Sequence, residues 1–138
     1  NESFDFILTD VPYWNIDTAK KTRSKNDAKS KLNDFKINNQ NQTKEEWLDM
    51  MKQIISLATD KLKNNKYMAV FIGDVYKDKK YHCLSAELAN KLEEIDGLTL
   101  KSNIIWVDNS KSLHIFGYPY SYVPSMIHQN ILVLKKER

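Results

Sequence analysis

The stretch FDFILTDVPYWNI, residues 4–16, joins a strand-like run to an unusual ending. Residues 4–9 form a short, largely apolar run, partly aromatic or β-branched, which is typical of a strand buried on both faces. The run ends abruptly at an acid, Asp10. It is followed by Val11, Pro12, Tyr13 and Trp14. An acid, a rigid imino acid and two large aromatics at a strand's end favour a cleft over a simple chain reversal, so this cluster is the first candidate site.

Hydrophobic spacing predicts two helices and three further strands. Thr43 and Glu46 form a capping-box pattern, which predicts the start of a helix of about five turns. Its apolar stripe comprises Trp47, Met51, Ile54, Ile55, Ala58 and Leu62. A second amphipathic helix is predicted from Leu84 to Ile95, with Gly97 as its C-terminal cap. Strands are predicted over residues 67–72, 103–107 and 129–136.

The order of these elements predicts an α/β fold with helices on the faces of a mostly parallel sheet. The first three strands are expected to run parallel with right-handed crossovers, and the last, which no helix precedes, to return antiparallel. The carboxyl ends of parallel strands share one edge, where open α/β sheets bind ligands. The segments that leave this edge are residues 10–44, 73–82 and 108–127. We therefore expect the acid-proline-aromatic cluster, a basic loop and a tyrosine-rich loop to meet on one rim.

Positive charge is concentrated in one segment of the 138-residue chain, which is expected to be a single domain. Residues 15–44 carry no sustained apolar period and are predicted to be a long loop. Within it, residues 19–44 hold eight Lys or Arg against two Asp. Contact with phosphates and a merely solvated surface both fit such a run. The candidates for phosphate contact are Lys20, Lys21, Arg23, Lys25, Lys29 and Lys31.

The composition argues against several other classes of protein. No run of 18 or more apolar residues predicts a membrane span, and no charged-then-apolar leader predicts a signal peptide. The single cysteine, Cys83, provides no disulfide framework and suits a reducing cytosol. With three scattered histidines it gives no zinc-ligand spacing. The three glycines lie far apart and form no nucleotide-binding loop.

The chain also begins at Asn1, directly before a predicted strand, so we expect a piece of something larger.

The segment TDVPYW resembles the (D/N/S)PP(Y/F/W) signature of S-adenosylmethionine-dependent methyltransferases that modify the exocyclic amine of adenine at N6 or cytosine at N4 in DNA. The resemblance covers nearly the whole chain apart from residues 15–44. Four segments occur in the order expected for the catalytic half of such enzymes: FDFILTDVPYW, KYMAVFIGDVYK, NIIWV and FGYPYSYVPSMIHQNILVLKK. The resemblance implies a Rossmann-like methyltransferase sheet, S-adenosylmethionine as cofactor, double-stranded DNA as partner, and a cytoplasmic enzyme of restriction-modification or orphan modification.

The resemblance also implies a role for each residue of the cluster. The Asp10 carboxylate and the main-chain carbonyl of Val11 accept the two hydrogens of the target amine, and Asp10 is also a candidate contact to the cofactor. Pro12 stiffens the direction of that carbonyl. Tyr13 stacks on a base flipped out of the duplex, and Trp14 extends the pocket wall.

Two departures from the family pattern leave alternatives open. Val11 stands where the family has its first proline, so weaker preorganisation is expected. The glycine-containing donor-binding motif is absent, so the donor-binding half is expected outside this chain. A noncatalytic methyltransferase-like subunit that binds nucleic acid, and a methyltransferase acting on RNA or on a protein amide, remain alternatives. The oligomeric state, a homodimer included, stays open.

Two further sites have both a structural and a functional interpretation. Tyr118, Tyr120 and Tyr122 leave the expected active edge and either pack their loop against the sheet or contact substrate. Asp74, just beyond the second strand, either caps a helix or turn or takes part in the active site.

Overall fold

The computed structural model of the chain describes residues 1–14, 42–111 and 126–138. The strands and helices are β1 (Phe4–Asp10), α2 (Lys44–Lys61), β2 (Leu62–Ile72), β3 (Val75–Lys77), β4 (Lys80–His82), α3 (Leu84–Leu92), β5 (Leu98–Val107) and β6 (His128–Lys136). Most of the predicted loop lies outside the described residues. Its end is described, and there Thr43 and Glu46 form the predicted capping box at the start of α2.

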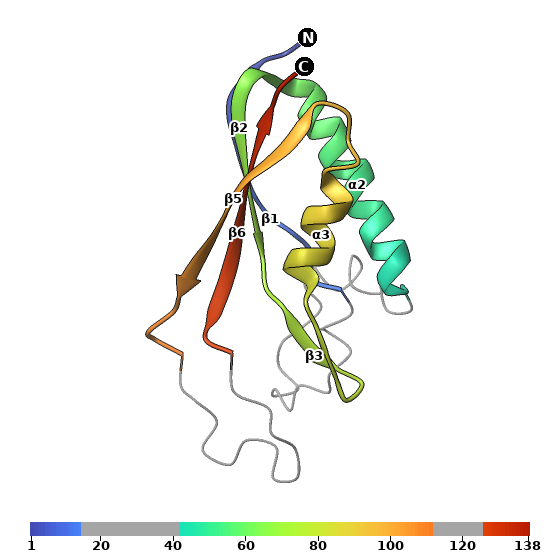
Figure 1. Cartoon of the computed structure of the whole chain (residues 1–138), viewed down its shortest axis with the longest axis vertical. Coiled ribbons are helices and arrows are strands. Elements are labelled where there is room, and N and C mark those ends of the chain that lie inside the picture. Colours follow the sequence, from blue (N-terminus) through green and yellow to red (C-terminus); the bar gives the residue numbers. More distant parts are fainter. Residues whose placement is uncertain (15–41, 112–125) are drawn as a thin grey trace, which may run out of the picture.

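Four strands form one sheet in the order β1-β2-β6-β5. β1 and β2 are parallel, and β6 is antiparallel to both β2 and β5. β1, β2 and β5 therefore point the same way and β6 points the opposite way, which confirms the predicted α/β class and strand directions. Because β6 inserts between β2 and β5, only the β1–β2 pairing is parallel. The ends of β1, β2 and β5 lie together at the lower edge in Figure 1, called here the carboxyl edge.

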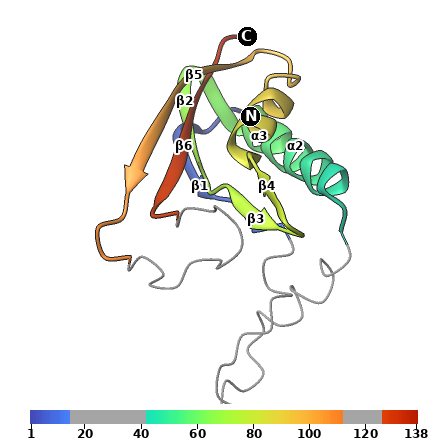
Figure 2. The same ribbon diagram turned by 60° about the horizontal axis from the view of Figure 1, so that its bottom comes forward.

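Both helices cover the same face of the sheet (Figures 1 and 2). The buried residues of α2 are Trp47, Leu48, Met51, Ile55 and Thr59. The four apolar ones pack in one core with α3 and with alternate residues of the central strands, among them Met68 and Val70 of β2 and Leu132 and Leu134 of β6. Ile54, which the sequence placed on the apolar stripe, is exposed. The two described helices therefore cover one face. Enclosing the sheet would need helices on the other face as well.

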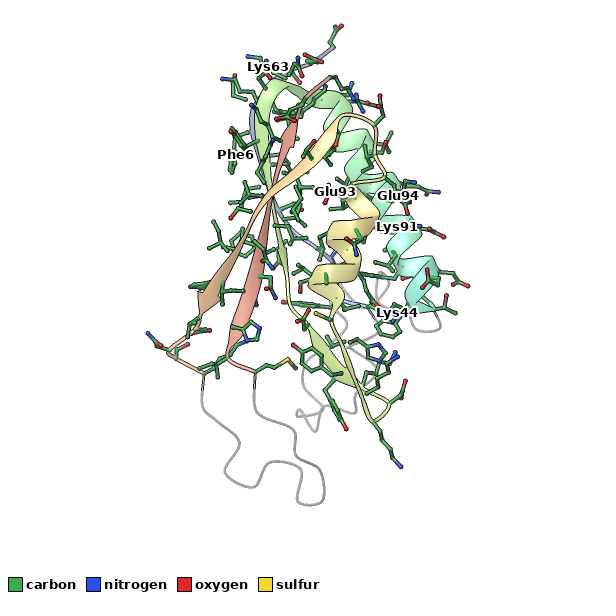
Figure 3. The ribbon with its side chains drawn as sticks, in the orientation of Figure 1. Phe6, Lys44, Lys63, Lys91, Glu93 and Glu94 are labelled. Carbon is green, nitrogen blue, oxygen red and sulfur yellow. The ribbon has the colours of Figure 1, made fainter. Side chains whose placement is uncertain are left out.

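The opposite face of the sheet is apolar and uncovered in the part of the chain that is described. Register places Phe6 beside Tyr67, Leu8 beside Ala69, and Asp10 beside Phe71 on this side. Figure 3 shows Phe6 pointing away from the helices. The large apolar side chains exposed here include Phe6, Leu8, Tyr67, Ile104 and Trp106. We call this surface the open face.

An ion pair joins residues near the two ends of the chain, at the edge opposite to the carboxyl edge. The Lys136 side chain is 1% exposed, and its Nζ lies 2.9 Å from Glu2 Oε1. The same ammonium donates to the Leu62 carbonyl oxygen at 2.6 Å. Both termini lie at this end in Figure 1. Among the described helices, none is long and apolar enough to cross a membrane.

Candidate active site

Asp10 is the last residue of β1 and is exposed at the carboxyl edge. It pairs with Phe71 of β2, and therefore its side chain belongs to the open face. The Phe71 ring meets Trp106 of β5 edge-on, with the ring centroids 6.2 Å apart. The exposed carboxylate thus lies next to an aromatic pair at the carboxyl edge.

Val11 is anchored in the core on the other side of the sheet. Its side chain is 3% exposed, and its N–H donates to the Phe71 carbonyl oxygen at 3.4 Å. This bond extends the β1–β2 ladder by one residue. A proline at this position would supply neither the N–H nor the branched side chain, so Val11 holds the backbone by packing and hydrogen bonding instead of by a ring. Whether its carbonyl receives an amine stays a prediction.

Two buried indoles hold the residues that follow. The Trp47 indole N–H, from the first turn of α2, donates to the Pro12 carbonyl oxygen at 2.9 Å. The Trp14 indole N–H donates to the Gln42 carbonyl oxygen at 2.8 Å. Trp14 is itself 7% exposed, so its predicted role as a pocket wall remains a prediction. The sequence marked Trp47 as core and carried no signal for its bond to Pro12.

Tyr13 is half-exposed and lies near the Asp10 charge. Partial burial raises the pKa of the Tyr13 hydroxyl, and the Asp10 carboxylate raises it further. A hydrogen bond from the Gln129 side chain opposes both effects. Gln129 belongs to β6 and pairs across the sheet with Trp106. Sequence reasoning missed Gln129, because only strand pairing brings the start of the last strand beside Tyr13.

Asp74 caps α3 and holds the β3–β4 hairpin. One carboxylate oxygen accepts the Ser85 N–H at 2.9 Å, and the other accepts the Tyr81 hydroxyl at 2.8 Å. Cys83 at the N-cap position of α3 makes no capping bond of its own, so Asp74 replaces it. Partial burial and this bond to Asp74 raise the pKa of Tyr81 strongly. The capping interpretation of Asp74 is confirmed.

The hairpin rests on Trp14. The Trp14 ring meets His82 of β4 edge-on at a centroid distance of 5.1 Å. The Lys77 ammonium of β3 lies 4.1 Å from the centre of the same ring. The segments that leave β1 and β2 are therefore in direct contact, as the shared carboxyl edge predicted.

The remaining predicted site residues fall outside the described part of the chain. They are Lys20, Lys21, Arg23, Lys25, Tyr118 and Tyr120, and their contacts with substrate stay predictions. Within residues 1–14, 42–111 and 126–138, no three His, Cys, Asp or Glu side chains lie together as metal ligands would.

Solved structures share this fold at low sequence identity. PvuII DNA methyltransferase, cytosine-N4-specific, matches 98% of this chain with a TM-score of 0.70 and 15% identity, over 43% of its own length. A candidate DNA modification methylase from Thermus thermophilus, complexed with S-adenosyl-L-methionine, matches 99% with a TM-score of 0.63 and 16% identity, over 46% of its length. The M1.HpyAVI complex with SAM matches 99% with a TM-score of 0.51 and 17% identity, also over 46%.

The chain thus spans less than half of the length of each of these structures. No curated protein sequence matches it significantly. A family model for N6 and N4 DNA methylases matches residues 4–138, which is nearly the whole chain. The chain therefore belongs to the N6/N4 DNA methylase family.

Proposed function

We propose that this chain is the base-binding and catalytic half of an S-adenosylmethionine-dependent DNA methyltransferase that modifies the exocyclic amine of adenine (N6) or cytosine (N4). The observation that carries the proposal is the exposed Asp10 carboxylate at the end of β1, with half-exposed Tyr13 close enough to feel its charge. Open α/β sheets bind ligands at this edge. Family membership and the resemblance of TDVPYW to the methyltransferase signature support the same assignment.

The chain's own residues supply the amine-binding part of the reaction. An exocyclic amine is a poor nucleophile because its lone pair is conjugated with the ring. Asp10 accepts one amine hydrogen and the Val11 carbonyl accepts the other, which directs the nitrogen lone pair out of the ring plane. Tyr13 stacks on the flipped base and offsets part of the few kcal/mol that unstacking costs. The proton leaves after the nitrogen is alkylated, so the site needs positioning and electrostatics more than a strong base.

S-adenosylmethionine, when bound, supplies an electrophilic methyl group. The residues of this chain fit it only in part: Asp10 borders the open face, but the three glycines lie far apart in the sequence and form no nucleoside-binding loop. We therefore assign donor binding to a second half, carried by the same polypeptide or by a partner subunit. The SAM complexes of the Thermus protein and of M1.HpyAVI, each about twice as long as the matched region, support this division.

The topology supports a location for that second half. β1 is an edge strand of the described sheet, and the open face beside it is apolar. Right-handed crossovers that proceed from β1 toward β5 put helices on the covered face. Strands added at the free edge of β1 and proceeding the other way would put their helices on the open face. Such a reversal of strand order creates a ligand-binding crevice at β1, next to Asp10.

Methyl transfer by the assembled methyltransferase to duplex DNA tests the proposal. We expect Asp10→Ala to lower kcat by about 100-fold or more, because a charge-assisted contact made to the reacting group is lost. Asp10→Asn keeps one acceptor oxygen, so its kcat should lie between those of Asp10→Ala and the unmodified protein. Asp5→Ala is the matched control, since Asp5 is an exposed acid on the same strand that pairs with Lys63 at 3.1 Å, away from the carboxyl edge. Equal activity of Asp10→Ala and Asp5→Ala would remove Asp10 from the mechanism.

The alternatives make different predictions in the same assay. A noncatalytic subunit would bind DNA in a salt-dependent manner and show no donor binding in the assembled protein. The anchored Val11 weakens this alternative, because the backbone after Asp10 is held even without the first proline. Competition among duplex DNA, RNA and a glutamine-containing peptide separates the nucleic-acid and protein-amide alternatives, and product analysis separates adenine from cytosine.

A further inference from the structure

We propose that the β3–β4 hairpin is a second DNA-contacting element, with Lys79 and Lys80 binding backbone phosphates next to the base-binding site. The inference rests on the proposed function for its ligand, duplex DNA. It concerns an element whose residues the motif resemblance does not assign to DNA contact.

The hairpin stands where a duplex would have to approach. It leaves β2 at the carboxyl edge and extends past the ends of the sheet strands (Figures 1 and 2). Its inner side holds Trp14 through Lys77 and His82, and Trp14 directly follows Tyr13 in the chain. A nucleotide stacked on Tyr13 therefore brings its neighbouring phosphates toward this hairpin.

The tip of the hairpin carries two lysines and one acid, Asp78, and therefore a net positive charge. Lys79 and Lys80 are exposed, and in the described part of the chain neither forms an ion pair. Most other lysines there do have an acidic partner. Those within salt-bridge distance of one are Lys44, Lys52, Lys63, Lys91, Lys101, Lys135 and Lys136. Unpaired ammonium groups that release counterions from DNA are the usual source of salt-dependent affinity.

The hairpin is held in shape before any ligand arrives. Asp78 and Lys79 at its turn have φ values of 53° and 61°, as a two-residue turn of the I′ kind requires. Tyr81 is bonded to Asp74, which also caps α3. A preformed element loses less conformational entropy on binding than a free loop does. Each contact from its lysines therefore contributes more to the binding free energy. These features distinguish the hairpin from a basic segment that is merely solvated.

Duplex-DNA binding by the assembled methyltransferase, measured as a function of salt concentration, tests the inference. The variant Lys79→Gln with Lys80→Gln removes two charges and keeps side-chain length. We expect the slope of log K against log salt to fall in magnitude by about 1.8, and affinity at about 0.15 M salt to fall by roughly 30-fold. The matched control is Lys61→Gln with Lys66→Gln, which removes two charges from exposed lysines near the end of α2 and the start of β2.

The control should leave the slope within about 0.3 of the unmodified protein. An unchanged slope in the hairpin variant, or an equal loss in the control, would overturn the inference. Tighter binding of a duplex RNA of the same length, lost in the hairpin variant, would assign the hairpin to RNA and also overturn it. Failure of the proposed function is distinguishable: duplex binding would then keep its dependence on the hairpin while methyl transfer is absent.

Discussion

The two faces of the sheet carry similar side chains and differ in what covers them. Beneath the helices, Met68, Val70 and Leu134 are fully buried, whereas on the open face Phe6 and Leu8 are 54% and 61% exposed. Strand residues alternate between faces, so the sequence pattern alone gives both faces an equal claim to burial. The described helices, α2 and α3, therefore cover one face of the sheet and leave the other without a cover from the described residues. An apolar surface of this kind usually marks an interaction site.

Truncating one leucine on each face should change the free energy of unfolding by very different amounts. Leu134→Ala should lower the free energy of unfolding of the chain alone by about 2–5 kcal/mol, because it leaves a cavity in the core. Leu8→Ala should change it by less than about 0.5 kcal/mol, as expected of an exposed side chain. Urea unfolding measures both.

The same pair tests the proposed cover. In the assembled methyltransferase, Leu8→Ala should lower the free energy of unfolding by more than about 1 kcal/mol, because the proposed second half buries the leucine there. A Leu8 substitution that stays neutral there would contradict helices on the open face. A Leu134 substitution that is neutral in either form would contradict the core itself.

A smaller effect is expected at the boundary between the faces, where Asp10 is exposed and Val11 is buried. Val11→Pro should lower the free energy of unfolding by about 1–2 kcal/mol, since it removes methyl packing and the N–H bond to Phe71. Val11→Ala is the matched comparison because it loses the methyl groups and keeps the N–H. Stabilisation by the proline, measured by the same unfolding assay, would mean that the ladder bond at Val11 contributes nothing.

The smallest effect concerns the ionisation of Tyr13. Its pKa is raised above the ordinary value of 10.0 by partial burial first and by the Asp10 charge second. A raised pKa in the folded state gives a stabilisation that is complete below the unfolded pKa and is lost as pH rises through the folded one. Asp10→Asn should lower the Tyr13 pKa while burial keeps it above the unfolded value, as ultraviolet titration of the phenol would detect. An unchanged Tyr13 pKa in Asp10→Asn would mean that the Asp10 charge does not act on the Tyr13 hydroxyl.

Local signals predicted the elements better than their boundaries and neighbours. The capping box at Thr43 and Glu46 was predictable because it depends on residues three positions apart. The end of α3 was not: the helix stops at Leu92, and Gly97, with φ of 73°, lies in the turn before β5 and is not its cap. The strand directions were predictable too, because the last connection contains no predicted helix. The insertion of β6 between β2 and β5 was not, since strand order depends on long-range pairing.

The candidate site divides in the same way. Asp10 and Tyr13 could be proposed from the sequence because the motif is contiguous, and their roles stay predictions. Gln129 and the hairpin contacts of Trp14 were not found, because pairing between distant strands brings those groups together. Asp74 was recognised with both roles open; its bond to the Ser85 N–H confirms the cap, and a part in the active site stays a prediction.

The ion pair between Glu2 and Lys136 bears on the order in which the segments of such a protein can be encoded. Because both termini lie at the end of the sheet remote from Asp10, a fusion partner joined through either terminus would enter from behind and leave the carboxyl edge clear. Neighbouring termini are also what makes circular permutation tolerable. A second segment could therefore be joined before or after this chain without altering the surroundings of Asp10.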